Sequence, residues 1–379
     1  MNLLKLTQKL ISIPSYVNSR TNEKAIGDFV FGYLKQFDYL SVKKQKIKTD
    51  RFNIIAKTKG QSRLFLAAHM DTAEPKTGWS KKQLVGTIKN NKLFGLGALD
   101  NKSGLATILD SLNDLKDVSG LTLLFYCDEE YDFKGMKKFV SQYNKEIGNL
   151  AIVVEPSDLK IWNAQRGLIE IHFAIQGRTG HSANPANSNN AIDGITDILS
   201  DIKKWLMQFR DRVLGESSMN IAYIRGGLNL GQKNRSKILI GKQGNNIADF
   251  AEAVIEIRPS TLELNAKKII QRIIKVTKAK KLRVLDFCIK HNYSALYAKK
   301  ECVDRFEMIM KKILGKIEYL DASKKGYGDG QLLQEKFNIP VVYFGPRGAN
   351  AHGIDEWVDI ISLKKLRKIY SSVIRRYCQ

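Results

Sequence analysis

The chain has 379 residues, more than one hydrophobic core usually takes, so we expect two domains. Its formal net charge is +24, but the Lys residues are spread along the whole sequence without zinc-finger spacing or an aromatic–basic motif, which argues against a nucleic-acid partner. The four cysteines are scattered and include no CxxC pair, which argues against a disulfide framework. No apolar run is long enough for a signal peptide or a membrane span. We therefore expect a cytoplasmic protein with no membrane partner.

Helical and strand-like patterns alternate through the first part of the chain. The amphipathic N-terminus predicts a helix to about Ile11, and residues 22–37 predict a second helix. VKKQKIK and RFNIIAKTKG then predict edge strands. The run LFLAAHMDT (64–72) has the length of a buried strand and ends on His69 and Asp71. In open α/β sheets, ligands bind at the carboxyl ends of strands, so these polar side chains are placed for chemistry.

A glycine-rich loop follows this strand. The pair Asn90 and Asn91 predicts a hairpin turn, and LFGLGALDNKSGLA places Asp100 directly before a helix that runs to about Leu115. Gly104 would allow this helix to approach the sheet closely. The GLG triplet does not match a dinucleotide-binding loop, because the third glycine is misplaced and no acidic partner follows at the required distance.

The pattern of an apolar run followed by a carboxylate or a histidine recurs along the chain. LTLLFYC precedes Asp128, Glu129 and Glu130, AIVV precedes Glu155, and VVYFGP precedes His352. If these runs are neighbouring strands of one sheet, five ligand-type side chains converge on one rim: His69, Asp100, Glu130, Glu155 and His352. Two imidazoles and three carboxylates suit a pair of divalent ions such as zinc, with one carboxylate bridging.

Each of these features alone also has a less specific interpretation. A histidine two residues before an aspartate often occurs by chance. A Glu-Glu pair is usually a solvated surface, and a glutamate after a strand often begins a helix, where the helix dipole favours it. Only the features together indicate a metal centre.

From residue 167 to about 291 the pattern changes to alternation, in GLIEIHFAIQG and ADFAEAVIEIRPS, with a helix from about Asn190 to Arg210 between them. Alternation with one polar face is typical of an antiparallel sheet covered by helices on one side. The expected fold class is α/β, with a mixed, mostly parallel sheet flanked by helices (1–166 and 292–379) and an inserted α+β domain (167–291).

The residues resemble a known family, the zinc-dependent amidohydrolases that include acetylornithine deacetylase, succinyl-diaminopimelate desuccinylase and glutamate carboxypeptidase. The likeness covers nearly the whole chain and rests on five motifs in the family's order: AAHMDT, GLGALDNKSG, CDEE, VVEPSD and GPRGANAHGIDEWV. It implies that the main domain is a catalytic di-zinc domain and that the insert is a lid that also forms a homodimer.

The resemblance implies a role for each metal ligand. His69 and Glu155 would hold one zinc ion, Glu130 and His352 would hold the other, and Asp100 would bridge them. Co²⁺ is a possible replacement for Zn²⁺.

The same resemblance implies the catalytic and substrate-binding residues. Asp71 would orient His69 from behind, and Glu129, the carboxylate left free of metal, would be the general base. His181, in GRTGHSANP, would stabilise the oxyanion in the partner's active site, although a histidine in such a loop is more often a turn residue. The matching lid positions that bind substrate are Asn246 in GNNIAD and Arg258 in EIRP.

Arg166, in QRG beside the insert, is a further candidate for substrate binding. The sequence departs from the family pattern at two positions. Arg347 interrupts the glycine-rich run before the last histidine, and the bulky Tyr327 stands in the substrate-contacting loop KGYGDG, where family members often carry a small hydroxyl residue. Neither is a proposed ligand, so both departures concern the preference for the acyl group.

The resemblance therefore predicts a hydrolase of amino-acid metabolism, of the deacylase or carboxypeptidase type, that cleaves the amide bond of N-acyl amino acids or small peptides with a free carboxylate. The alternative is a di-zinc dipeptidase or aminopeptidase, although family aminopeptidases tend to carry Asp where this chain has Glu155. A remote alternative is an inactive relative with a binding role, which the intact ligand set and Glu129 disfavour.

Overall fold

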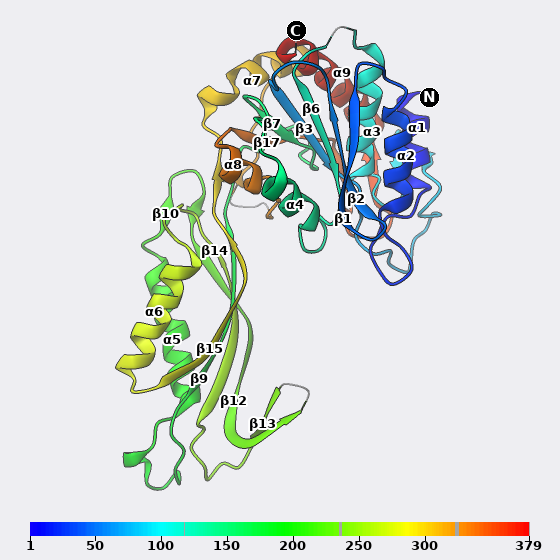
Figure 1. Cartoon of the computed structure of the whole chain (residues 1–379). Coiled ribbons are helices and arrows are strands. Elements are labelled where there is room, and N and C mark those ends of the chain that lie inside the picture. Colours follow the sequence, from blue (N-terminus) through cyan, green and yellow to red (C-terminus); the bar gives the residue numbers. More distant parts are fainter. Residues whose placement is uncertain (117, 235–236, 323–325, 379) are drawn as a thin grey trace. The chain divides into compact units, whose positions relative to one another are not determined.

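The computed structural model describes residues 1–116, 118–234, 237–322 and 326–378 (Figure 1). The chain forms two compact units. Unit 1 comprises Met1–Asn163, Tyr297–Asp321 and Gly328–Gln379, and unit 2 comprises Ala164–Leu296 and Ala322–Tyr327. The predicted insert, 167–291, lies inside unit 2, whereas the return of the chain to unit 2 near residue 322 was not predicted.

The elements of unit 1 follow one another along the chain as α1 (Leu3–Ile11), α2 (Lys24–Leu34), β1 (Ser41–Lys48), β2 (Arg51–Lys57), β3 (Leu64–His69), β4 (Thr87–Lys89), β5 (Lys92–Phe94), α3 (Lys102–Ser111), η1 (Leu112–Asp114), β6 (Leu121–Tyr126), α4 (Lys134–Gln142), β7 (Ala151–Val153), α7 (Lys300–Leu314), α8 (Gln331–Phe337), β17 (Val341–Tyr343), β18 (Gly348–Ala349), β19 (Trp357–Asp359) and α9 (Ile360–Tyr377).

The elements of unit 2 are β9 (Leu168–Gln176), η2 (Pro185–Asn187), α5 (Ala191–Leu206), β10 (Arg210–Asp211), β11 (Gly215–Glu216), β12 (Ser218–Asn234), β13 (Lys237–Gly241), β14 (Phe250–Arg258), α6 (Ala266–Ala279) and β15 (Arg283–Tyr293). The short strands β8 (Ala164–Gln165) and β16 (Leu296–Tyr297) occur where the sequence passes from one unit to the other.

The main sheet of unit 1 has the strand order β1-β2-β6-β3-β7-β17. Strands β6, β3, β7 and β17 run parallel, and β1 and β2 pair antiparallel at one side. The predicted mixed, mostly parallel sheet is therefore confirmed. The prediction of RFNIIAK as an edge strand was wrong, because β2 lies between β1 and β6, where both of its edges are paired.

Strand β3 shows why its sequence is apolar without alternation. Leu64 and Leu66 point into the core formed with α1, α2, α3 and α9, whereas the Phe65 ring lies 5.4 Å from that of Phe139 in α4, on the opposite face. Helices thus cover both faces of the sheet (Figure 1). A strand that is buried on both sides needs apolar residues at every position.

Unit 2 is built differently. Its antiparallel sheet has the order β13-β12-β14-β9-β15, and alternate residues of β9 and β14 pack against α5 and α6. Asn190 and Asn265 cap the two helices, each side chain accepting hydrogen bonds from backbone amides of the first turn. The predicted helix to Arg210 is shorter in the structure, because α5 ends at Leu206.

A small second sheet in unit 1, with the order β18-β19-β5-β4, holds segments from distant parts of the sequence together. The turn between β4 and β5 is the predicted one, with Asn90 and Asn91 at backbone φ angles of 49° and 59°. Strand β19 pairs antiparallel with β5, so the residues before β19 lie beside the loop that follows β5.

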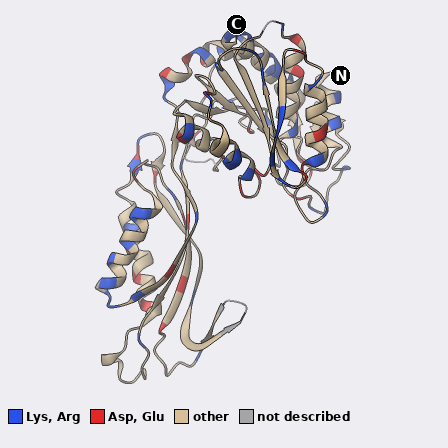
Figure 2. Ribbon diagram, viewed as in Figure 1, with Lys and Arg blue, Asp and Glu red and all other residues tan. Residues whose placement is uncertain are grey.

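The basic residues and the cysteines are spread over the structure. Lys and Arg are scattered over the helices and strands of both units (Figure 2). All four cysteines of the chain are free. Within the described residues, no helix combines the length and the apolar content needed to span a membrane.

Candidate metal centre

The five candidate ligands lie at the carboxyl end of the main sheet, and all belong to unit 1. His69 is the last residue of β3, and Glu130 follows the end of β6 by four residues. Glu155 follows β7, and Asp100 precedes α3. His352, with a backbone φ of 59°, lies in the loop between β18 and β19. The parallel strands thus bring His69, Glu130 and Glu155 to one edge, and the loops next to the small sheet add Asp100 and His352.

Asp100 lies between the two histidines. Its Oδ1 is 3.0 Å from His69 Nε2, and its Oδ2 is 3.3 Å from His352 Nε2. The first histidine also faces Glu155 Oε1 at 3.7 Å, and the second faces Glu130 Oε2 at 2.9 Å. Three groups of possible ligand atoms lie close together among the described residues: His69 with Asp100 and Glu155, His352 with Asp100 and Glu130, and His69 with Glu129 and Glu130. The first two groups share Asp100.

The carboxylates of this site are crowded and largely buried. Burial, followed by repulsion from Asp100, raises the pKa of Glu155 well above its usual value and also raises that of Glu130. Although burial opposes it, hydrogen bonds from His352 and His69 hold the pKa of Asp100 below its usual range. A site of this composition needs positive charge, either as protons or as metal cations.

One unpaired atom supports cations in particular. Glu130 Oε1 is buried and has no hydrogen-bond partner among the described residues. Buried carboxylate oxygens are rarely left without a partner, and a metal ion is one of the groups that satisfies them. Together with the two imidazole nitrogens on opposite sides of Asp100, this atom makes the donor set fit two divalent ions of the zinc type.

Asp71 contacts more than the histidine it was expected to orient. His69 Nδ1 lies 3.1 Å from the backbone oxygen of Asp71 and 3.6 Å from its carboxylate. The same carboxylate accepts hydrogen bonds from the amides of Glu129 and Glu130, at 3.2 and 2.9 Å. Asp71 therefore fixes the backbone of the Glu pair as well as the ring of His69.

A buried ion-pair network behind the Glu pair was not predicted from the sequence. Arg51 pairs with Glu23 at 2.6 Å and also contacts Asp128, the residue before Glu129. The amide of Asp128 in turn donates to Glu23 at 3.0 Å. Each member looks like an ordinary charged residue in the sequence, and only the tertiary contact shows its role.

Two of the expected lid residues are neighbours in unit 2. His181 and Asn246 form an antiparallel β-bridge. His181 is exposed, and its Nδ1 accepts a hydrogen bond from the amide of Ala183 at 3.2 Å. The loop therefore presents a histidine and an amide side by side.

The two candidate arginines also lie near each other in unit 2. Burial, followed by the nearby charge of Arg258, lowers the pKa of Arg166. Arg258 is at the end of β14 and pairs with Glu256 at 2.9 Å, with 29% of its side chain exposed. It is therefore less buried than its apolar sequence context suggested, and its strand carries carboxylates on the polar face.

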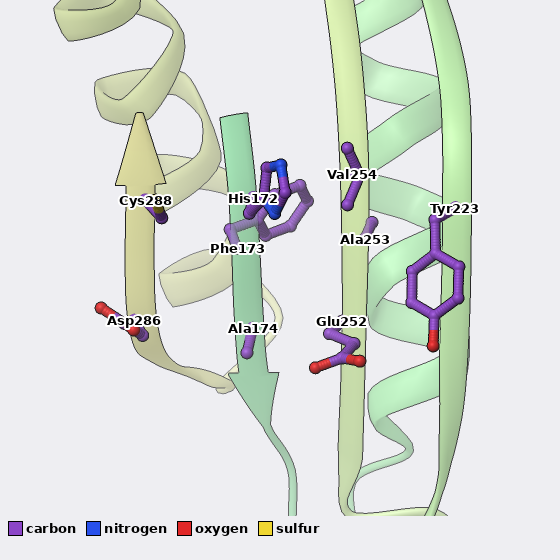
Figure 3. A pocket seen from close by; sticks show the side chains of 9 residues that line it. All are labelled: His172, Phe173, Ala174, Tyr223, Glu252, Ala253, Val254, Asp286 and Cys288. Atoms are coloured by element: carbon purple, nitrogen blue, oxygen red, sulfur yellow. The ribbon is translucent and has the colours of Figure 1, made fainter. Parts of the chain in front are cut away.

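A hollow of about 440 Å³ lies on the sheet of unit 2. It is lined by side chains from neighbouring strands, including His172 of β9, Glu252 of β14 and Tyr223 of β12 (Figure 3). Glu252 pairs with Arg225 at 2.9 Å, and His172 pairs with Glu170 at 2.7 Å. None of the predicted site residues lines it.

Comparison with known proteins places the whole chain among hydrolases. A family model described as "Peptidase family M20/M25/M40" matches residues 65–376. An acetylornithine deacetylase of Buchnera aphidicola subsp. Schizaphis graminum is 27% identical over 403 residues, covering 100% of this chain and 98% of that protein. A succinyl-diaminopimelate desuccinylase of Wolinella succinogenes is 26% identical over 388 residues, covering 97% and 98%. A tripeptidase of Staphylococcus aureus has the same fold, with a TM-score of 0.75 at 21% identity, covering 99% of this chain and 97% of that one.

Proposed function

Since the chain belongs to peptidase family M20/M25/M40 and is thus a metal-dependent amidohydrolase, we propose that it uses two zinc ions to cleave the amide bond of N-acyl amino acids or small peptides with a free carboxylate. The observation that carries this proposal is the position of Asp100, whose two oxygens face two different histidines. His69 and Glu155 would hold one ion, and Glu130 and His352 the other. Co²⁺ is an alternative occupant of the same donor set.

The chemistry would divide between the ions and the residues around them. Bound zinc would lower the pKa of a water molecule and polarise the acyl carbonyl. Glu129 lies beside the proposed ligands, and in the metal-free site burial, followed by repulsion from Glu155, raises its pKa well above its usual value. As the carboxylate left free of metal, it would take a proton from the attacking water and return it to the leaving amine. Asp71 would keep Glu129 and His69 in place through the contacts described above.

We also propose a homodimer formed through unit 2, in which His181 of one chain stabilises the oxyanion in the other. Between Ser218 and Gly227, β12 pairs with β14, and β13 pairs only from Leu228 onward. This stretch carries exposed Tyr223 and Ile224, and a sheet edge with exposed apolar side chains suits pairing with a second copy. A cytoplasmic location is supported by the four free cysteines.

The neighbouring arginines support a substrate that carries a carboxylate. The charge of Arg258 lies close enough to lower the pKa of Arg166, and two neighbouring guanidinium groups favour an anion between them. Asn246 adds an amide on the same unit. This recognition matches the chemistry named by the two relatives, acetylornithine and succinyl-diaminopimelate, both of which are N-acyl amino acids. A peptidase that instead recognises a free amino terminus is the alternative.

The test compares free-acid and C-terminally amidated forms of the same N-acyl amino acids. Wild type should prefer the free acid, and Arg258→Ala should lower kcat/KM for it by about 30-fold, corresponding to about 2 kcal/mol for a partly exposed charge pair. Arg272→Ala removes a comparably exposed ion pair, with Asp201, from helix α6 of the same unit and serves as the control. Equal cleavage of both forms by wild type, or a preference for dipeptides with a free amino terminus, would favour the peptidase alternative.

A further inference from the structure

Glu356 of unit 1 contacts the loop of Asp100 without being one of the proposed ligands. We propose that Glu356 is a positioning residue that fixes the loop of Asp100 to the segment of His352, and so sets the two halves of the centre relative to each other. The inference rests on the proposed di-metal function. The inference is based on hydrogen bonds in the structure. The sequence pattern gave no indication of these bonds.

The fold places Glu356 beside the Asp100 loop through strand pairing. In the small sheet, Trp357 of β19 is opposite Phe94 of β5. The next position continues this pairing, because the amide of Gly95 donates to the backbone oxygen of Glu356 at 3.0 Å. The register of two short strands thus delivers the side chain of Glu356 to the loop that runs from Gly95 to Asp100.

The carboxylate then accepts three backbone amides of that loop. Oε2 accepts from Gly97 at 2.7 Å, and Oε1 accepts from Leu99 at 2.8 Å and from Asp100 at 2.9 Å. Only 2% of Glu356 is exposed, so these bonds have no competition from solvent. Three amides from four consecutive residues bound to one carboxylate leave the loop little freedom, and the last of them belongs to the shared ligand itself.

The loop is shaped for this contact. Gly97 has a φ of +75°, and a Cβ atom at this position would come within 2.5 Å of Thr72 Cγ2. A residue with a side chain would therefore be strained here both by its backbone angle and by its neighbours. The glycine turns its amide toward Glu356 in the space available.

Asp100 is held from two sides by one segment. Its amide donates to Glu356, and its Oδ2 faces His352, four residues earlier in the sequence. Moving Glu356 would therefore shift the shared ligand relative to the second histidine. The expected consequence is weaker binding of the ion that depends on both.

A carboxylate suits this position better than an amide. Glu356 is acceptor-only when ionised, and all three partners are donors. In Glu356→Gln, the NH₂ group would face an amide donor, so at least one of the three bonds would be lost at nearly constant volume. The variant thus tests the hydrogen bonds without opening a cavity.

The experiment uses two measurements on wild type, Glu356→Gln and the control Asp355→Asn, which changes the neighbouring carboxylate bound to the amide of Ser80. Hydrogen exchange by mass spectrometry on the metal-free proteins reports the protection of residues 95–101. Calorimetric titration with Co²⁺ reports the number and affinity of bound ions. In Glu356→Gln, we expect faster exchange confined to residues 95–101 and about a tenfold or greater loss of affinity for the second ion, whereas the control behaves like wild type.

The two measurements separate this inference from the proposed function. Wild-type exchange and wild-type affinities for both ions in Glu356→Gln would overturn the positioning role. A wild-type protein that binds fewer than two ions would overturn the di-metal proposal, while the exchange data would still decide whether Glu356 holds the loop. If hydrogen exchange in Glu356→Gln is faster along the whole chain, the variant Glu356→Asp is measured as well, because it keeps the carboxylate. Restored protection of residues 95–101 in Glu356→Asp supports the positioning role, and exchange as fast as in Glu356→Gln overturns it.

Discussion

Glu129 and Glu130 are adjacent in the sequence but differ in their surroundings. Glu130 contacts His352, and its second oxygen is buried without a partner among the described residues. Burial, followed by repulsion from Glu155, raises the pKa of Glu129, and its carboxylate lies close to both His69 and Glu130. One side chain is thus suited to a metal and the other to a proton.

Glu129→Gln should therefore lower kcat by about 10² to 10⁴-fold, the usual contribution of a general base, and leave the metal content unchanged. Glu130→Gln should lose metal as well as activity. Elemental analysis alongside steady-state kinetics distinguishes the two. A Glu129→Gln enzyme with near-normal kcat would show that another group accepts the proton.

Asp329 gives a prediction about pH. It is fully buried beside the centre, accepts a hydrogen bond from Tyr126 at 2.9 Å, and burial raises its pKa from the usual 3.8 to about 7. Between these values the folded state binds the proton more tightly than the unfolded state, so the stabilisation from the protonated carboxyl is lost as pH rises toward 7.

In metal-free protein, wild type should therefore lose stability relative to Asp329→Asn between pH 5 and pH 7, by at most about 1.4 kcal/mol per pH unit, and the difference should level off above pH 7. Denaturant unfolding of both proteins across this range measures it. A constant difference in stability would mean that Asp329 does not titrate in this window.

At the residue scale, the sequence predicts the ligand-type residues that follow strands, but few of the contacts that hold these residues in place. Four of the five ligand-type residues were identifiable because each comes shortly after an apolar run, and Asp100 because it lies in a glycine-rich loop directly before a helix. The contacts of Glu356 join residues more than 250 positions apart, and Arg51 reaches Asp128 across 77 positions. No local pattern encodes such pairs, since they depend on strand register and on which elements become neighbours.

At the scale of elements, Gly104 allows the first turn of helix α3 to pack against Val154, the residue that follows strand β7. A Cβ atom on Gly104 would come within 2.2 Å of Val154 Cγ1, so the predicted close approach of this helix to the sheet is confirmed. In α2, by contrast, Gly32 has no neighbour within 4 Å of its added Cβ. A side chain at Gly104 would therefore clash with a neighbour, whereas a side chain at Gly32 would have free space.

Gly104→Ala should destabilise unit 1 by about 1 to 3 kcal/mol, because α3 must move away from a packed sheet, and should also weaken metal binding through Asp100. Gly32→Ala should be neutral or stabilising by up to about 1 kcal/mol, because only helix propensity changes. Thermal unfolding of both variants checks the pair. Equal effects of the two substitutions would contradict the packing argument.

The elements that the sequence predicted well are those with one clear periodicity. Strands β3, β6 and β7 are buried on both faces and appear as apolar runs, whereas β9 and β14 are buried on one face and alternate. Strand β2 was predicted at an edge, but its residues are buried or half-buried along its whole length. The long β12 gave no signal, since its mixture of Gly, Asn and apolar residues fits neither period.

At the scale of the whole molecule, the proposed homodimer makes the active site a shared structure. Equal mixing of His181→Ala chains with Glu129→Gln chains, each inactive alone, should restore about a quarter of wild-type activity, because half of the dimers are mixed and each has one intact site. Activity measured after subunit exchange tests this. Absence of recovery, with exchange demonstrated, would exclude a histidine that acts across the dimer.

The high positive charge of the chain is compatible with the proposed hydrolase function. The Lys and Arg residues are dispersed over the helices and strands of both units (Figure 2), and many of them pair with nearby carboxylates, as Arg272 does with Asp201. The metal centre itself is acidic. The distribution thus suits cations in the site and a small anionic substrate recognised by specific arginines.

The most direct test of the central claim is a titration of metal-free protein with zinc, in which bound metal and hydrolysis of N-acetylornithine are measured at each step. We expect two ions to bind per chain and hydrolysis to appear with them, and Asp100→Ala to abolish both the second ion and the activity. Saturation at a single ion, or hydrolysis that is unchanged by Asp100→Ala, would contradict a centre shared through that aspartate.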